Sequence, residues 1–133
     1  MEVAKARSPD DLEPAFMQLV SAQVSAVLVS NDALFVSQRV QLVASAKRHS
    51  LPATYEFREF PAIGGLMSYG PRLSEPYQKT GTYAALMLRG ARPGDLPIQQ
   101  PTAFELVINS ATARSLGIQI PPALLLRADD AIE

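Results

Sequence analysis

In the first half of the chain, segments with apolar residues at helical spacing alternate with short, largely apolar segments typical of strands. Four of them recur with helical spacing and predict a helix over residues 9–22: Leu12, Phe16, Leu19 and Val20. The run 26–29 is short, apolar and rich in β-branched residues, as in a strand buried on both faces of a parallel sheet. Helical spacing returns over 33–49, and residues 51–57 read as the next strand. This alternation with short turns predicts a parallel sheet with right-handed crossovers.

The central part of the chain continues the same alternation. Residues 58–65 are predicted to form a loop, and residues 66–70 a short strand. A long helix is predicted over 73–89, with five inward-facing candidates: Tyr77, Tyr83, Ala84, Met87 and Leu88. Gly90 follows directly and suits the end of a helix.

The last third combines a connector with another strand and helix. Residues 91–102 carry three prolines and predict an extended connector with few backbone donors. Residues 104–109 read as a strand, and residues 110–117 as a short helix stopped by a glycine. Residues 120–133 are predicted to begin extended at two prolines and to close with one helical turn or two. At the other end, "MEVA" (1–4) looks like the tail of an earlier strand.

Composition narrows the class of protein. A chain of 133 residues has the size of one ordinary domain, and 47% hydrophobic residues make it too apolar to be disordered. A net charge of −1 gives no electrostatic footprint for nucleic acid. The absence of cysteine excludes disulfides, thiolate metal sites and a cysteine nucleophile. No run approaches the length of a membrane span, and the N-terminus lacks the apolar core of a signal peptide, so we expect the chain to stay in the compartment where it is made.

The residues that most often carry catalysis or bind metals offer little here. His49 is the single histidine, and at the end of a helix its positive charge is favourable against the helix dipole. It has no histidine or cysteine partner for a metal site, and a serine–histidine–aspartate triad would depend on it alone. The two acidic pairs are interpreted as caps or solvated charge: Asp10 with Asp11, and Asp129 with Asp130. The sequence contains neither of the two glycine-rich phosphate-binding motifs, G-x-x-x-x-G-K-[ST] and G-x-G-x-x-G.

Three polar segments follow or end the predicted parallel strands, where open α/β sheets bind ligands. They comprise nine residues: Ser30, Asn31 and Asp32; Phe57, Arg58 and Glu59; Ser68, Tyr69 and Gly70. Arg58 could pair bidentately with an acid, and Tyr69 or Phe57 could stack on an apolar ring. Each segment alone is also an ordinary turn. The pattern by itself supports an α/β domain, with small-molecule binding and simple connection as alternative readings.

Longer motifs carry a resemblance over essentially the whole chain. They are "GLMSYG" (65–70), "PGDLP" (93–97), "FELVIN" (104–109) and "TARSLGIQIPPALLLRAD" (112–129), with "RSPDDLEPAF" and "HSLPATYEFREF" upstream. Together they resemble the C-terminal part of the substrate-binding proteins of ABC transporters, in particular the tryptophan/tyrosine type. The combined spacing is long and therefore specific.

The resemblance implies a fold and a function. The fold would be three-layer αβα with a mostly parallel sheet, like a truncated type I periplasmic binding protein. Residues 1–70 would belong to the second lobe, and residues 71–133 would add a crossover helix, a strand and the C-terminal segment to form one compact α/β unit. The protein would bind a small molecule, plausibly an amino acid, in a cleft between two lobes and deliver it to an ABC permease. It would not be an enzyme and would use no cofactor, metal or nucleic acid.

The resemblance also suggests roles for the three polar segments. Residues 30–32 resemble a cleft loop of the second lobe, residues 57–59 another cleft edge, and residues 68–70 a strand crossing between lobes. The resemblance implies that full-length members are periplasmic or extracellular and begin with an export signal and a complete first lobe. By comparison with them, we expect the signal, the first lobe and the first strand of the second lobe to be missing here. The open sheet edge that this leaves predicts a homodimer. Two alternatives stay open: a self-associating or regulatory α/β domain without solute binding, and a small hydrolase or transferase.

Overall fold

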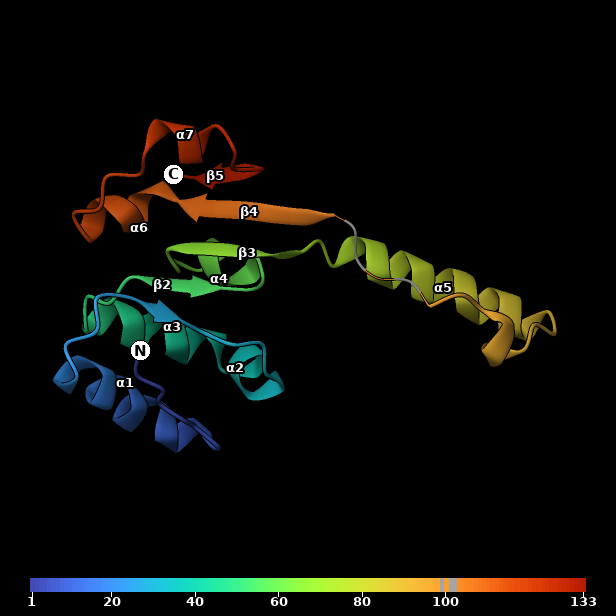
Figure 1. Ribbon diagram of the computed structural model, residues 1–133, viewed down its shortest axis with the longest axis horizontal. Helices are drawn as coiled ribbons and strands as arrows, with labels where there is room; N and C mark the ends of the chain where they lie inside the picture. Colours follow the sequence, from blue (N-terminus) through green and yellow to red (C-terminus); the bar gives the residue numbers. More distant parts are fainter. Residues whose placement is uncertain (99, 101–102) are drawn as a thin grey trace. The chain divides into compact units, whose positions relative to one another are not determined.

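The computed structural model describes residues 1–98, 100 and 103–133, and it divides into two compact units (Figure 1). Unit 1 comprises Met1–Gly70 and Glu105–Glu133. Unit 2 comprises Pro71–Phe104.

Unit 1 is built on a five-stranded sheet whose spatial order, β1-β2-β3-β4-β5, follows the sequence. The strands are β1 (Val27–Leu28), β2 (Ala53–Tyr55), β3 (Met67–Pro71), β4 (Phe104–Asn109) and β5 (Asp130–Ile132). β1, β2 and β3 pair in parallel, as do β4 and β5. β3 and β4 run antiparallel, since the Asn109 amide donates to Leu66 and the Arg72 amide donates to Ala103. The predicted mostly parallel sheet is therefore confirmed, with one antiparallel pair at β3–β4.

The helices of unit 1 begin and end close to the predicted boundaries. The predicted helix 9–22 is a 3₁₀ turn, η1 (Pro9–Asp11), continued by α1 (Leu12–Ser21). The predicted helix 33–49 is two helices, α2 (Ala33–Ser37) and α3 (Arg39–Arg48), which are separated at Gln38. Three shorter helices complete the unit: α4 (Glu59–Ala62), α6 (Ser110–Ser115) and α7 (Pro122–Leu125).

Three local predictions were wrong. Residues 58–65 are not simply a loop, because Glu59–Ala62 form α4 with a carboxylate in its first turn. After α7, residues 130–132 form β5, because the edge of β4 gives this short segment a strand to pair with. Residues 1–4 form no strand, because β1 is the outermost strand of the sheet and nothing pairs with them there.

The hydrophobic core of unit 1 lies between α1, α3 and β2. Leu12 and Phe16 of α1 are 1% and 3% exposed and pack with Leu42 of α3 and Tyr55 of β2. Phe60 of α4 stacks on Tyr55, with ring centroids 4.4 Å apart. The inward face predicted for the first helix therefore contains Leu12 and Phe16, whereas Val20 is 42% exposed.

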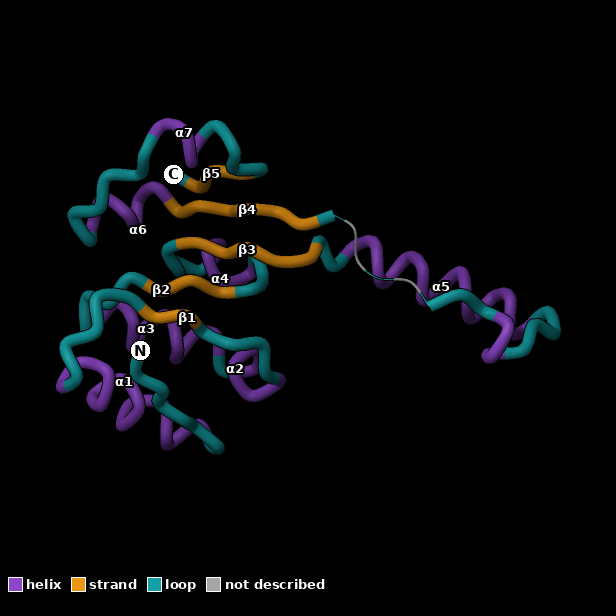
Figure 2. The backbone as a smooth tube through the Cα atoms, in the orientation of Figure 1, coloured by secondary structure: helices purple, strands orange, loops and turns teal. Residues whose placement is uncertain are grey.

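Unit 2 consists of one helix and the segment that follows it in the sequence (Figure 2). The helix, α5 (Ser74–Leu88), ends before Gly90, whose φ of +100° is easily adopted by glycine. A 3₁₀ turn, η2 (Pro93–Asp95), follows, and the Tyr83 hydroxyl donates to the Pro97 carbonyl over 2.6 Å. In the predicted connector 91–102, residues 99, 101 and 102 lie outside the described residues.

None of the described side chains of α5 is buried. Of the five inward positions predicted for this helix, Tyr83 is partly buried, whereas the other four are exposed, and Leu88 is 90% exposed. Helical spacing alone marks an amphipathic face but does not supply the surface that would cover it.

Candidate functional site

The strand directions bring several polar residues to one edge of the sheet. Because β3 and β4 are antiparallel, the carboxyl ends of β1, β2 and β3 lie at the edge where β4 and β5 begin (Figure 1). Arg58 follows β2, whereas Glu105 and Asp130 lie at the beginnings of β4 and β5. The Arg58 side chain contacts both of these acids.

Arg58 bridges two carboxylates at this edge. Its Nη1 donates to Glu105 Oε2 over 3.2 Å, and its Nη2 donates to Asp130 Oδ2 over 2.7 Å. The Glu105 side chain is only 5% exposed, so the guanidinium compensates a carboxylate that would otherwise be costly to bury. Arg58 pairs with acids, as its chemistry suggested, but here with acids of its own chain.

Glu105 and Asp130 were missed at the level of sequence. The signal for Glu105 was its position as the single charge in the strand "FELVIN". Asp130 was interpreted as solvated charge, because its partner lies 72 residues away in the sequence. Its neighbour Asp129 accepts a hydrogen bond from the Leu106 amide over 2.9 Å, which agrees with a structural role for that carboxylate.

Gly70 lets the β2–α4 connection approach β3. A Cβ atom at position 70 would collide with the carbonyl oxygen of Glu56 and with its Cγ atom. Only glycine accommodates this approach without a backbone shift. Glu56 lies two residues before Arg58 in this connection.

The segment Ser30, Asn31 and Asp32 connects β1 to α2. All three residues are exposed, and Asp32 Oδ1 accepts the Leu34 amide over 2.8 Å as the N-cap of α2. Ser30 also lines a hollow of about 90 Å³ beside β1. The connecting role of this turn is therefore visible in the structure.

The remaining predicted residues lie in different surroundings. Phe57 is partly buried against the core, and Glu59 is exposed in the first turn of α4. Ser68, Tyr69 and Gly70 lie within β3, as in the predicted strand 66–70; Tyr69 is 60% exposed, whereas its two neighbours are buried.

Two buried hydroxyl groups lie on neighbouring strands. Ser68 is the register partner of Tyr55, and neither Ser68 Oγ nor the Tyr55 hydroxyl has a hydrogen-bond partner among the described residues. Burial raises the pKa of the Tyr55 phenol. A strongly buried neutral phenol of this kind packs the core and is not placed to act as a base.

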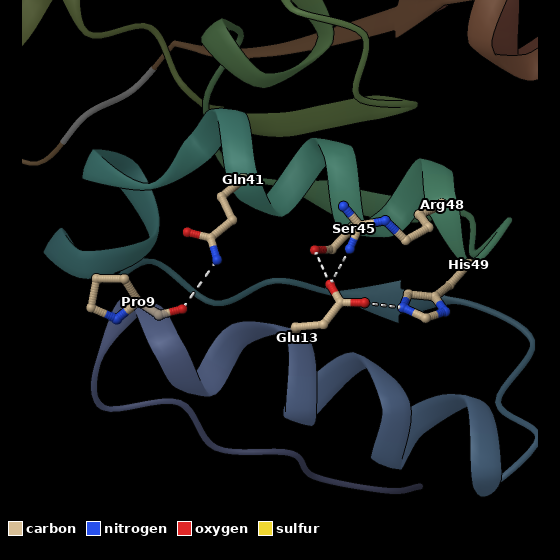
Figure 3. Close-up of polar contacts among 6 residues, drawn as sticks. All are labelled: Pro9, Glu13, Gln41, Ser45, Arg48 and His49. Carbon is tan, nitrogen blue, oxygen red and sulfur yellow. Dashed lines mark hydrogen bonds and ion pairs between the residues drawn. The ribbon is translucent and has the colours of Figure 1, made fainter.

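A second polar cluster joins α1 to α3 (Figure 3). Glu13 accepts a hydrogen bond from Ser45 Oγ over 2.8 Å and an ion pair from Arg48 Nη1 over 2.8 Å, and it lies 2.7 Å from His49 Nε2. These hydrogen bonds, that of Ser45 first, lower the pKa of Glu13 to about 2.

His49 is therefore more than a helix-terminal charge. Its ring also stacks on Phe16, with centroids 6.1 Å apart, and its side chain is only 19% exposed. Ser45 is 1% exposed and donates to Glu13, so no accessible serine–histidine pair forms at this cluster. The cluster connects two helices and lacks the geometry of a hydrolase triad.

Other kinds of site find little support in the part of the chain that the structure describes. No group of three or more histidine, cysteine, aspartate or glutamate residues there could hold a metal ion. No helix in these residues is both long enough and apolar enough to cross a membrane. Unit 2 has a hollow of about 410 Å³ lined mainly by apolar groups, including Tyr83, Met87 and Leu96, but it contains none of the predicted site residues.

Comparison with known proteins decides the family. Residues 1–132 match the model of the family described as ABC transporter substrate binding protein. The chain belongs to this family. Its members are generally non-enzymatic carriers, and full-length members are periplasmic or extracellular. No curated protein matches the chain at a significant level.

Solved structures agree with this assignment. The match to a conserved domain protein from Vibrio cholerae has 26% sequence identity and a TM-score of 0.88, and it covers 96% of this chain and 43% of that protein's chain. A domain from Streptococcus pneumoniae in complex with L-Trp is also 26% identical, with a TM-score of 0.87, and covers 98% of this chain and 45% of its own. A ligand-free, open substrate-binding protein from Clostridium difficile, 19% identical with a TM-score of 0.61, covers 92% of this chain and 41% of its own and supports the fold alone.

The chain spans less than half the length of the solved relatives that it matches. The α/β fold and membership of the substrate-binding family are assigned to this chain. The activity, ligand and partners of the longer proteins are not transferred with it.

Proposed function

We propose that the chain forms part of the solute-binding component of an ABC transporter and binds an amino-acid-like molecule at the edge that carries Arg58, Glu105 and Asp130. The observation that carries the proposal is the convergence of these three side chains at the carboxyl ends of β1, β2 and β3. The family match supports it, and so does the L-Trp bound to the Streptococcus pneumoniae relative.

Carboxylates at these strand ends support recognition of the ammonium group of such a ligand. Arg58 contacts Glu105 and Asp130, and the exposed residues Asp32 and Glu59 follow β1 and β2. A ligand ammonium group would pair with such carboxylates, whereas a ligand carboxylate would compete with Glu105 and Asp130 for Arg58.

The finer features of the proposal come from the family. The ligand would be held in a cleft between lobes, and closure of the lobes would present it to the permease. The nine residues predicted from the sequence, from Ser30 to Gly70, remain proposed ligand contacts. In this scheme the full-length protein acts outside the cytoplasm.

Isothermal titration calorimetry on the full chain tests the proposal. We expect L-tryptophan and tryptamine to bind and indole-3-propionate, which lacks the ammonium group, to bind much more weakly. Asp130→Asn should weaken L-tryptophan binding about tenfold, since a hydrogen bond to a charged group contributes on the order of 1.5 kcal/mol. The matched control is Asp95→Asn in unit 2, which should leave binding unchanged. Equal binding of indole-3-propionate, or no binding of either L-tryptophan or tryptamine, would contradict the proposal.

A second candidate is a self-associating α/β domain that binds no solute. The specific observation in its favour is the outermost strand β1, where Leu28 is 80% exposed. An uncovered edge of this kind pairs readily with another chain. We therefore also propose that the chain forms a homodimer, as the open sheet edge predicted from the sequence.

A further inference from the structure

We propose that unit 1 binds one internal water molecule, which bridges the hydroxyl of Tyr55 in β2 to polar groups of α6 and of the segment before β3. The water would lie in a small hollow between α3, β2 and α6. All the groups involved belong to unit 1. The inference goes beyond the proposed function and does not depend on solute binding.

The Tyr55 hydroxyl is a buried polar group that lacks a partner in the chain. Tyr55 is 2% exposed, and its hydroxyl makes no hydrogen bond to any described residue. Folding removes this group from solvent, which is unfavourable unless another hydrogen bond replaces the one that is lost. Buried polar groups without a protein partner are commonly bonded to ordered water. The hydroxyl therefore indicates a hydration site.

Two neighbours fix the direction of the Tyr55 ring. The ring stacks on Phe60, with centroids 4.4 Å apart and planes inclined by 10°. Gly65 donates its amide to the Phe60 carbonyl over 2.8 Å, and a Cβ atom at position 65 would lie only 2.8 Å from Cε2 of Tyr55. Cε2 is bonded to the ring carbon that carries the hydroxyl. The polar end of the ring therefore lies close to Gly65.

A hollow with room for one water molecule lies at this place. Its volume is about 20 Å³, and both Tyr55 and Gly65 line it, together with residues of α3 and α6. A cavity of about 10–15 Å³ can hold one water molecule. The hollow is too small for an organic ligand, so its size favours water as the occupant. Ser68, whose hydroxyl is also unpartnered, does not line it, so the proposal concerns Tyr55 alone.

The walls of the hollow also carry acceptors with unused capacity. Thr112 Oγ1 donates to the Gly64 carbonyl over 2.9 Å, and Ser115 Oγ donates to the Thr112 carbonyl over 2.8 Å. All three residues line the hollow. A hydroxyl that donates its one hydrogen can still accept, and a carbonyl oxygen has two lone pairs. A water molecule could accept from Tyr55 and donate to these oxygens, none of which Tyr55 bonds directly.

The bridge would extend a buried polar network to β2. Asn109 Nδ2 donates to the Pro61 carbonyl over 2.9 Å, and Asn109 Oδ1 accepts the Thr112 amide over 2.8 Å. These bonds connect the end of β4 and the beginning of α6 to α4. With the water included, the network would also contain Tyr55 and would connect α6 to β2.

Urea denaturation distinguishes a bridged hydroxyl from an unpartnered one, because the two cases predict opposite signs. Tyr55→Phe removes only the hydroxyl. If a water bridges it, the variant loses hydrogen bonds, and its urea midpoint should fall by about 0.3–1 M. If the hydroxyl has no partner, the variant is relieved of a buried polar group, and the midpoint should rise. The matched control Tyr77→Phe makes the same change at a residue that is 73% exposed, and it should leave the midpoint unchanged.

A high-resolution crystal structure of the full chain locates the water directly. We expect electron density for one water molecule about 2.7–3.0 Å from Tyr55 Oη and within the same distance of a second oxygen atom of the hollow. An unchanged or higher urea midpoint in Tyr55→Phe, or a hollow without this density, would overturn the proposal. Because neither measurement involves a solute, failure here leaves the solute-binding proposal untouched.

Discussion

Glu13 shows at the residue scale how one carboxylate can hold two helices together. It lies in α1, and its three partners, Ser45, Arg48 and His49, all belong to α3 or follow it directly. The hydrogen bonds that lower its pKa are made only in the folded state, so they favour folding while Glu13 is ionised. Conformational stability therefore depends on the protonation of this side chain.

The sign of this dependence follows from the lowered pKa. The folded-state pKa of Glu13 is about 2, against an ordinary value of 4.5. The contribution is complete above the ordinary value and is lost as the pH falls from about 4.5 through about 2. Urea denaturation at several pH values should show a fall in stability over this window that is smaller in Glu13→Gln. The control Asp10→Asn removes an exposed carboxylate nearby and should retain the wild-type slope; an unchanged slope in Glu13→Gln would exclude this role.

At the scale of elements, the sequence predicts most of the fold because periodicity is a local property. Helices 9–22, 33–49 and 73–89 and four of the five strands were predicted close to their observed bounds. β5 was missed, since three residues beginning with an aspartate become a strand only beside β4. The same reason explains why only part of the site was predicted. Arg58 was predicted from its position after β2, whereas its partners Glu105 and Asp130 lie 47 and 72 residues away in the sequence.

Helix α5 allows a clean test of local helix energetics, because its stability owes little to packing. Gly81 lies in the middle of the helix, and a Cβ atom there would meet nothing within 4 Å. Gly81→Ala should therefore stabilise α5 by about 0.5–1 kcal/mol and increase the helical circular dichroism signal.

The control for this substitution is the glycine just after the same helix. Gly90 also has open space around it, but its φ is +100°, so Gly90→Ala should reduce helicity. If both substitutions change the signal in the same direction, α5 does not have the conformation described here.

At the scale of the whole molecule, the two units differ in how much of their structure is buried. In unit 1, Val107 and Ile108 of β4 are 0% exposed, and the strand is paired on both sides. In unit 2, none of the described side chains of α5 is buried. An isolated helix of this length is marginal in water, because helices in proteins derive most of their stability from tertiary packing.

Local stability should therefore follow the boundary between the units. Backbone amides of α5 should exchange with deuterium with free energies of opening near zero, whereas those of β4 should exchange only on global unfolding of unit 1. Hydrogen exchange followed by mass spectrometry separates the two, with peptides from α3 as an internal reference for a packed helix. The measurement should be repeated at a much lower protein concentration, so that any contribution from self-association is recognised. Protection of α5 equal to that of α3 at the lower concentration would show that unit 2 is stabilised by contacts other than those within it.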